Sequence, residues 1–268
     1  MLRKGDLTQG GITGTLLHFT LPMLVGSFLQ QCYNIADTLI VGQCIGAGAL
    51  AAVGSAYTLM VFLISVLLGL AMGSGTVFSL HYGAGNHVAL RRSIFSSFVL
   101  IGIVTLILNV AVFIWLDPIL RLLQVPQDIY GMMRSYLWII FCGIVFTFIY
   151  NFYASLLRAV GDSVTPLWFL AVSVVLNIAL DLFFILQLDW GIQGAASATV
   201  LAQGVAALGI IIYTYRRRPE LRWHHEDMCF DRTCLKEIAS FSTLTCVQQS
   251  VMNLGILMVQ GLVNSFGT

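Results

Sequence analysis

Long, uninterrupted apolar segments are the sequence feature that most restricts the fold of this chain. A hydrocarbon core of about 30 Å requires roughly 20 apolar helical residues, and seven segments reach that length. Their approximate spans are 14–42, 52–80, 93–116, 132–156, 165–188, 193–215 and 238–264. Backbone N–H and C=O groups in lipid must be paired within the chain, so these segments are predicted to be α-helices. Strands of a membrane β-barrel would alternate in polarity, whereas runs such as 101–108 are apolar throughout.

The composition supports a membrane protein over a soluble domain. Of the 268 residues, 58% are hydrophobic and 9% are charged, with a mean hydropathy of +0.90. Average soluble domains carry about 25% charged residues. The predicted fold class is therefore an all-α, polytopic helical bundle with membrane lipid as its surroundings. A net charge of +1 provides no basic field for a nucleic-acid partner.

The basic residues are distributed unevenly between the two sides of the predicted bundle. Eleven of the thirteen Lys and Arg residues fall in the loops on the side of the N-terminus, and only Arg121 and Arg134 fall opposite. Because cytoplasmic loops are enriched in Lys and Arg, the N-terminus is predicted to lie in the cytoplasm. The expected location is the cell (inner or plasma) membrane, crossed several times.

A polar, charged stretch at 216–237 divides the chain. Residues 1–215 form a predicted six-helix lobe, 216–237 a cytoplasmic linker, and 238–268 the first helix of a second lobe. Transporters are often built from such repeats. We therefore expect a partial chain whose C-terminal lobe is missing.

Two acidic residues, Asp37 and Asp181, lie inside apolar segments, where ionisable groups are costly and usually functional. At about 1.5 Å per residue, Asp181 lies roughly 22 Å into its segment and Asp37 roughly 24–32 Å. By the same measure Thr199 lies roughly 10 Å below the opposite face, so the three share one level. Asn177 precedes Asp181 by four residues and Asn34 precedes Asp37 by three, so each amide shares a helix face with its acid.

Such an oxygen-rich cluster suits a hard cation such as Na⁺. It also suits a proton, because burial and a nearby like charge favour the neutral carboxyl. The alternatives are that either acid lies at headgroup level near a helix end, and that the amides and Thr199 only join helices by hydrogen bonds. Pro22 is expected to kink the first helix, either in support of this site or for packing alone. No cofactor is expected beyond the coupling ion.

Other motifs point to structure rather than chemistry. A stripe of small residues, Gly69, Gly73 and Gly75, is typical of close helix packing. The linker contains residue types that can bind zinc, namely His224, His225, Cys229 and Cys234. Their spacing includes no CxxC pair, so no metal site is predicted there. The sequence contains no G-x-S-x-G, phosphate-loop or HExxH motif, which argues against an enzyme.

The chain resembles the multidrug and toxic compound extrusion (MATE) family of cation-coupled antiporters. Motifs spread over nearly the whole chain carry this resemblance: Leu21-Pro22, NIADTLIVG at 34–42, ALAAVG at 49–54, GLAMGSGT at 69–76, HYGAGN at 81–86, LRAVGDSVTP at 157–166, LNIALDLFFI at 176–185 and GIQGAASAT at 191–199. The resemblance implies two six-helix lobes that rock while organic cations or drugs leave and Na⁺ or H⁺ enters. By motif, the ion site of prokaryotic members falls on Asp37, Asn177, Asp181 and Thr199.

The sequence departs from the family pattern in its last segment. Members have about twelve helices, and the seventh segment here has an acid, Glu237, only at its entrance, as in DinF-like or MepA-like members. Ser242 and Leu244 stand where Gly and Pro are usual. Two other functions remain open. One is a lipid-linked or polysaccharide flippase, although no basic residue lies mid-segment to hold phosphate. The other is a non-transporting membrane fragment or scaffold.

Overall fold

The computed structural model describes residues 12–122, 125–223, 227 and 232–265, and these ranges contain helices but no strand. A π-helical turn, η1 (Phe183–Gln187), continues α6, and a 3₁₀ turn, η2 (Pro219–Leu221), follows α7. The α-helices are α1 (Ile12–Cys44), α2 (Ala47–Gly83), α3 (His87–Leu122), α4 (Gln127–Cys142), α5 (Ile144–Ala159), α6 (Val164–Leu182), α7 (Gly191–Arg217) and α8 (Arg232–Ser265). The predicted all-α, polytopic fold is confirmed.

The long helices are suited to a membrane by length and composition. Four of them, Ala47–Gly83, His87–Arg121, Val164–Gln187 and Gly191–Arg217, can cross a bilayer, and the bent pair α4–α5 makes five if it counts as one span. The remaining long helices, α1 and α8, have 33 and 34 residues, more than the roughly 20 that a crossing requires. Every predicted apolar segment is thus mainly helical over its described residues, with breaks at Gly143 and Leu188.

The fourth predicted segment, 132–156, is wrong as a single straight span. The chain bends by 47° where α4 meets α5. Gly143 separates the two helices, and its N–H is shared between the carbonyls of Ile139 and Ile140. A Cβ at Gly143 would lie 2.4 Å from Val200 Cγ2 of α7. The absent side chain therefore lets α7 cross closely at the bend.

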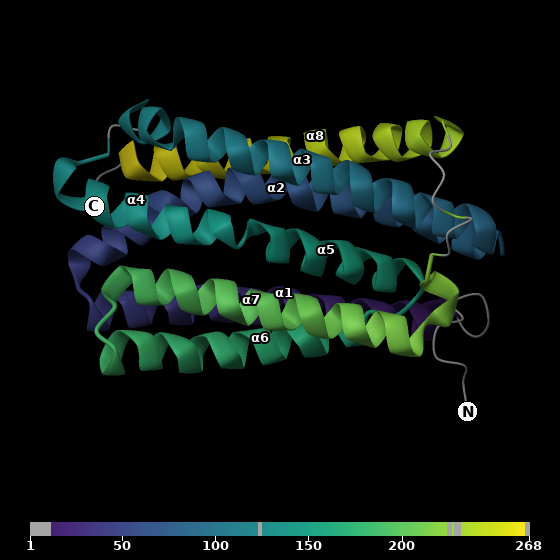
Figure 1. Ribbon diagram of the computed structural model, residues 1–268, viewed down its shortest axis with the longest axis horizontal. Coiled ribbons are helices and arrows are strands. Elements are labelled where there is room, and N and C mark those ends of the chain that lie inside the picture. The colour runs from purple at the N-terminus through teal and green to yellow at the C-terminus, as the bar shows by residue number, and fades with distance from the viewer. Residues whose placement is uncertain (1–11, 123–124, 224–226, 228–231, 266–268) are drawn as a thin grey trace.

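The helices form two groups with the bent pair between them (Figure 1). In the view of Figure 1, α2, α3 and α8 lie side by side on one side of α4–α5, and α1, α6 and α7 lie on the other. Aromatic rings of α2, α3 and α5 fill the core: Phe98 lies 5.3 Å from Phe152 and 5.4 Å from Phe148, and Phe78 lies 5.9 Å from Phe152, between ring centroids. The Phe98–Phe152 and Phe78–Phe152 pairs are edge-to-face, an arrangement that adds about 0.5–1.5 kcal/mol beyond burial.

Two glycines of the predicted small-residue stripe, Gly69 and Gly73, pack α2 against α8, whereas Gly75 faces Ser155 of α5. We call the contact between α2 and α8 the α2–α8 seam. A Cβ on Gly73 would lie 2.4 Å from Ser242 Cα, and one on Gly69 would lie 2.7 Å from Cys246 Cα. Ser242 Oγ donates to the Leu70 carbonyl at 3.3 Å, and Cys246 Sγ donates to the Val66 carbonyl at 3.4 Å. Small residues let these two backbones approach closely, which is how membrane helices gain packing energy.

The segment predicted as a polar linker folds onto the end of the bundle where most arginines lie, here called the basic end. Trp223 packs against Phe98 at 5.5 Å and Phe95 at 6.1 Å between ring centroids. Arg91 Nε donates to Asp227 Oδ2 at 2.7 Å, and Asp227 is only 4% exposed. The described part of the linker is therefore a packed element that ties α7 to α3.

Most of the cysteine and histidine residues considered as zinc ligands in the linker fall outside the described residues. His224, His225 and Cys229 lie outside the described residues. Cys234 is buried in α8, and its Sγ lies 2.8 Å from Ser93 Oγ. The described residues contain no group of three or more His, Cys, Asp or Glu side chains suited to a metal ion.

Candidate ion site

The four residues predicted at one membrane level come together where α1, α6 and α7 meet. Asp181 is fully buried, and Asn177, Thr199 and Asp37 are 1%, 6% and 9% exposed. Asn177 and Asp181 stand one turn apart on the buried face of α6, as their spacing predicts. The residues that the sequence placed at one depth therefore also lie together in the fold.

Asn177 is the centre of the hydrogen-bond network. When the Asn177 amide is oriented so that both its oxygen and its nitrogen have hydrogen-bond partners, Nδ2 donates to Asp181 Oδ2 at 2.9 Å. Its Oδ1 then accepts from the Thr199 N–H at 3.2 Å and from Thr199 Oγ1 at 3.3 Å. One amide thus connects the acid of α6 to the backbone and hydroxyl of α7.

The carboxyl groups of Asp37 and Asp181 interact with each other where α1 packs against α6. One oxygen of each, Asp37 Oδ1 and Asp181 Oδ1, is buried without a hydrogen-bond donor among the described residues. Two ionised carboxylates cannot donate to each other, and buried polar atoms are rarely left unpaired. The arrangement suits a positive ion or a shared proton at the point where the two acids meet.

Tyr33 belongs to the same cluster, and the sequence analysis missed it. Its hydroxyl lies 3.3 Å from Thr199 Oγ1, and it stands four residues before Asp37 on the same face of α1. Interactions therefore run from Asp37 through Asp181, Asn177 and Thr199 to Tyr33, which stands one turn from Asp37 on α1. We call these five residues the five-residue ring. The i−4 spacing from Asp37 was the signal that could have identified Tyr33.

The two residues predicted to support the site lie outside the five-residue ring. Asn34 Nδ2 donates to Gln31 Oε1 at 3.3 Å on a partly exposed face of α1. Pro22 lies inside α1, which continues through it as one helix. Fifteen residues separate Pro22 from Asp37, or about 22 Å along a helix, so Pro22 can affect the site only through the shape of α1.

The π-helical turn η1 begins two residues after Asp181. Such turns are rare and are often found at functional sites. Within this turn, Phe184 stacks on Trp190 with ring centroids 5.1 Å apart, and a Cβ on Gly194 would lie 3.1 Å from Phe184 Cβ. The end of α6 beyond the acid is thereby fixed against the start of α7.

A small cavity of about 20 Å³ adjoins the ring on the side of α5. Thr199, Gln203 and Thr147 line it with polar groups, and Thr147 Oγ1 donates to Gln203 Oε1. Gln203 follows Thr199 by one turn of α7. The cavity is large enough for about one water molecule, which makes it a polar extension of the site toward the basic end.

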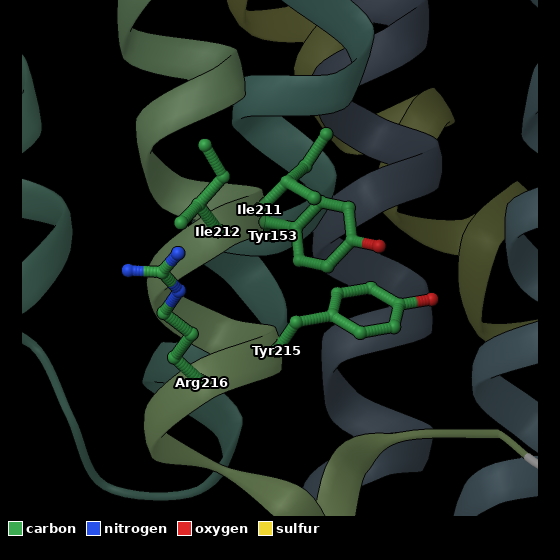
Figure 2. Close-up of a pocket in the computed structure, with 5 residues that line it drawn as sticks. All are labelled: Tyr153, Ile211, Ile212, Tyr215 and Arg216. Carbon is green, nitrogen blue, oxygen red and sulfur yellow. The ribbon is translucent and has the colours of Figure 1, made fainter.

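A larger groove of about 520 Å³ lies at the basic end and is separate from the acids. Figure 2 shows its lining: the Tyr153 and Tyr215 hydroxyls point to one side, and the Arg216 side chain points to the other. Tyr215 is sixteen residues from Thr199 on α7, or about 24 Å. This groove contributes nothing to the carboxyl pair.

Comparison with known proteins places this architecture in a family. The sequence matches the MatE family over residues 22–183, a stretch that contains Asp37, Asn177 and Asp181. The chain belongs to the MATE family. Its members are multi-pass membrane transporters, in agreement with the apolar helices described above.

Curated MATE relatives and solved MATE structures agree with this assignment. The chain is 32% identical over 273 residues to the "Probable multidrug resistance protein YpnP" of Bacillus subtilis, covering 99% of this chain and 59% of that protein. It is 31% identical over 210 residues to the "Multidrug export protein MepA" of Staphylococcus saprophyticus, covering 75% of this chain and 45% of that protein. An outward-facing MATE transporter of the MOP superfamily superposes with a TM-score of 0.91 at 23% identity, covering all of this chain and 59% of that one. The chain thus spans about three fifths of the length of these proteins or less.

Proposed function

We propose that the complete gene product is a secondary antiporter that exports organic cations or drugs in exchange for Na⁺ or H⁺. The observation that carries the proposal is the interaction between two buried carboxyl groups where α1, α6 and α7 meet, each with one oxygen that has no hydrogen-bond donor among the described residues. Lipid makes such acids expensive, and they are usually kept for ion handling. Relatives named for multidrug export support the cargo class.

The mechanism follows from where the acids stand. Asp37 is on α1, whereas Asp181 belongs to the α6–α7 unit that η1 and Trp190 hold together. A positive ion between the two carboxyls removes their repulsion and holds α1 against α6. Loss of the ion restores the repulsion and favours separation. An ion drives transport only through different affinities for two such states.

The proposed orientation places the N-terminus in the cytoplasm of the cell membrane. The basic end supports it, because the described helix ends and linker there carry Arg91, Arg92, Arg158, Arg216, Arg217, Arg218, Arg222, Arg232 and Lys236. The opposite end carries Arg121 and Arg134. A flippase for phosphate-bearing lipids is less well supported, since none of these residues reaches the five-residue ring.

The test is transport by the complete gene product in proteoliposomes loaded with a fluorescent organic cation. An imposed ΔpH or Na⁺ gradient should drive export by the wild type, while Asp37→Asn and Asp181→Asn should each abolish gradient-driven export. Asp189→Asn is the matched control, because Asp189 is exposed and has a positive φ of 52° that Asn tolerates. Export that persists in both ring variants would show that the carboxyl pair does not couple transport.

A further inference from the structure

We propose that the groove at the basic end binds an anionic phospholipid, with the lipid phosphate beside Arg216 and an acyl chain along α7. The groove measures about 520 Å³, within the range of pockets that hold small ligands. Its lining combines a cation, two phenol hydroxyls and two apolar side chains: Arg216, Tyr153, Tyr215, Ile211 and Ile212. Lipid binding at this groove is separate from the carboxyl pair and does not depend on the transport proposed above.

The charges around the groove favour an anion. Arg216 is exposed near the end of α7, and Arg222 Nε donates to the Tyr215 carbonyl at 2.6 Å, which holds a second guanidinium near the groove. Among the residues that the structure describes, no carboxylate pairs with Arg216 or Arg222. By contrast, Arg218 Nη2 lies 3.5 Å from Asp162 Oδ2. Two arginines thus keep donors for an anion, and the planar guanidinium group suits phosphate.

The two tyrosines supply hydroxyl groups on the other side of the groove. Figure 2 shows both hydroxyls pointing to one side and the Arg216 side chain pointing to the other. Tyr153 is 5% exposed, and the Tyr215 ring lies edge-to-face with Trp223 at 6.4 Å between ring centroids. Burial and ring packing therefore hold the tyrosines in place. A headgroup in the groove meets a cation on one side and hydroxyl donors on the other.

An exposed apolar stripe continues from the groove along α7. Its four side chains are each about half exposed: Leu201, Val205, Leu208 and Ile212. Spacings of four, three and four residues place them on one face of the helix. The stripe is about 16 Å long, close to half of a hydrocarbon core of about 30 Å. It therefore matches one leaflet of the membrane, and so the acyl chain of a lipid whose headgroup lies at Arg216.

The combination of charge and apolar surface favours a membrane lipid over other ligands. A free phosphate does not need an apolar stripe, and Arg216 and Arg222 repel a cationic cargo. Basic pockets between helices at the membrane surface bind the headgroups of acidic lipids. Phosphatidylglycerol has such a headgroup, whereas phosphatidylcholine carries a compensating positive charge.

The test measures lipid binding to the purified complete gene product in a neutral detergent by native mass spectrometry. Phosphatidylglycerol should bind at lower concentration than phosphatidylcholine with the same acyl chains, and glycerol phosphate should not displace it. Arg216→Gln should weaken phosphatidylglycerol binding about tenfold, which corresponds to the loss of one hydrogen bond to a charged group.

Neighbouring residues on α7 provide matched controls. Arg217→Gln removes the same charge from an exposed residue outside the groove lining, so its affinity for phosphatidylglycerol should stay close to that of the wild type. Tyr215→Phe removes one hydroxyl and should weaken binding severalfold. Tyr213→Phe should not, because the Tyr213 ring packs against Phe169 of α6.

The possible outcomes distinguish this lipid site from its alternatives. Equal losses in Arg216→Gln and Arg217→Gln would mean that arginines attract lipid without a defined groove, which would overturn the proposal. Displacement of the lipid by glycerol phosphate would assign the groove to a free phosphate. Stronger binding of a fluorescent organic cation in Arg216→Gln than in Arg217→Gln would assign it to cargo. If the variants fail to fold, equal wild-type affinities for the two lipids would still contradict the proposal.

Discussion

The five-residue ring and the α2–α8 seam both bury polar side chains between membrane helices, but they differ in what those side chains bind. In the seam, Ser242 and Cys246 donate to backbone carbonyls one helix away. In the ring, two carboxyl oxygens have no donor among the described residues. A buried polar residue in a membrane helix is therefore not a sign of function by itself. The sign is a buried charge whose partners do not complete its hydrogen bonding.

The largest expected effect on stability belongs to the seam. Gly73→Leu would place a Cβ 2.4 Å from Ser242 Cα, a backbone atom that cannot move aside. We expect a loss of about 3 kcal/mol or more, seen as a lower thermal unfolding midpoint in detergent. Gly54→Leu is the control, because a Cβ at Gly54 has no atom within 4 Å. Equal midpoints for both variants would show that the seam is not closely packed.

Within the ring, Asn177 should matter for stability as well as for transport. Asn177→Leu removes the donor to Asp181 and the acceptor for Thr199, so both are left buried without that partner. The expected cost is about 1–3 kcal/mol, measured by the same thermal unfolding. Asn34→Leu removes a partly exposed amide that donates to Gln31, so it should change the midpoint little. A midpoint for Asn177→Leu equal to that of the wild type would show that the hydrogen bonds of Asn177 do not stabilise the fold.

The smallest expected effect is the loss of one seam hydrogen bond. Ser242→Ala keeps the close approach of α8 to Gly73 and removes only the bond to the Leu70 carbonyl. Single interhelical hydrogen bonds in membranes average about 0.6 kcal/mol, so the midpoint should fall slightly. A change as large as that of Gly73→Leu would mean that hydrogen bonding, not packing, holds α2 to α8.

The sequence predicted the ring better than it predicted the shape of the bundle. Depth along the helices placed Asp37, Asp181 and Thr199 at one level, because rise per residue is a property of any helix. Tyr33 was missed, since aromatic residues are common in membrane helices and its role depends on the α7 neighbour that it meets. At the break, Gly143 lies closely against Val200 of α7, a contact that no local pattern encodes.

The linker illustrates a second limit of sequence reasoning. The sequence predicted a polar, charged linker there, but it did not predict the pair of Arg91 and Asp227, which lie 2.7 Å apart with Asp227 buried. Charge composition does not reveal which partner lies opposite. The start of α8 was also not predicted: the helix begins at Arg232, whereas the apolar segment begins near residue 238.

The most direct test of the account is to observe ion uptake by the two buried acids. If the ion is H⁺, infrared spectra of the purified complete gene product should show the carbonyl band of a protonated carboxyl, which disappears as the pH is raised. If the ion is Na⁺, adding Na⁺ should shift the carboxylate bands. Either response should be lost in Asp37→Asn and in Asp181→Asn, and it should remain in Asp189→Asn. A wild-type spectrum that responds to neither ion at any pH at which the protein is folded, or a response that survives in both ring variants, would contradict the account.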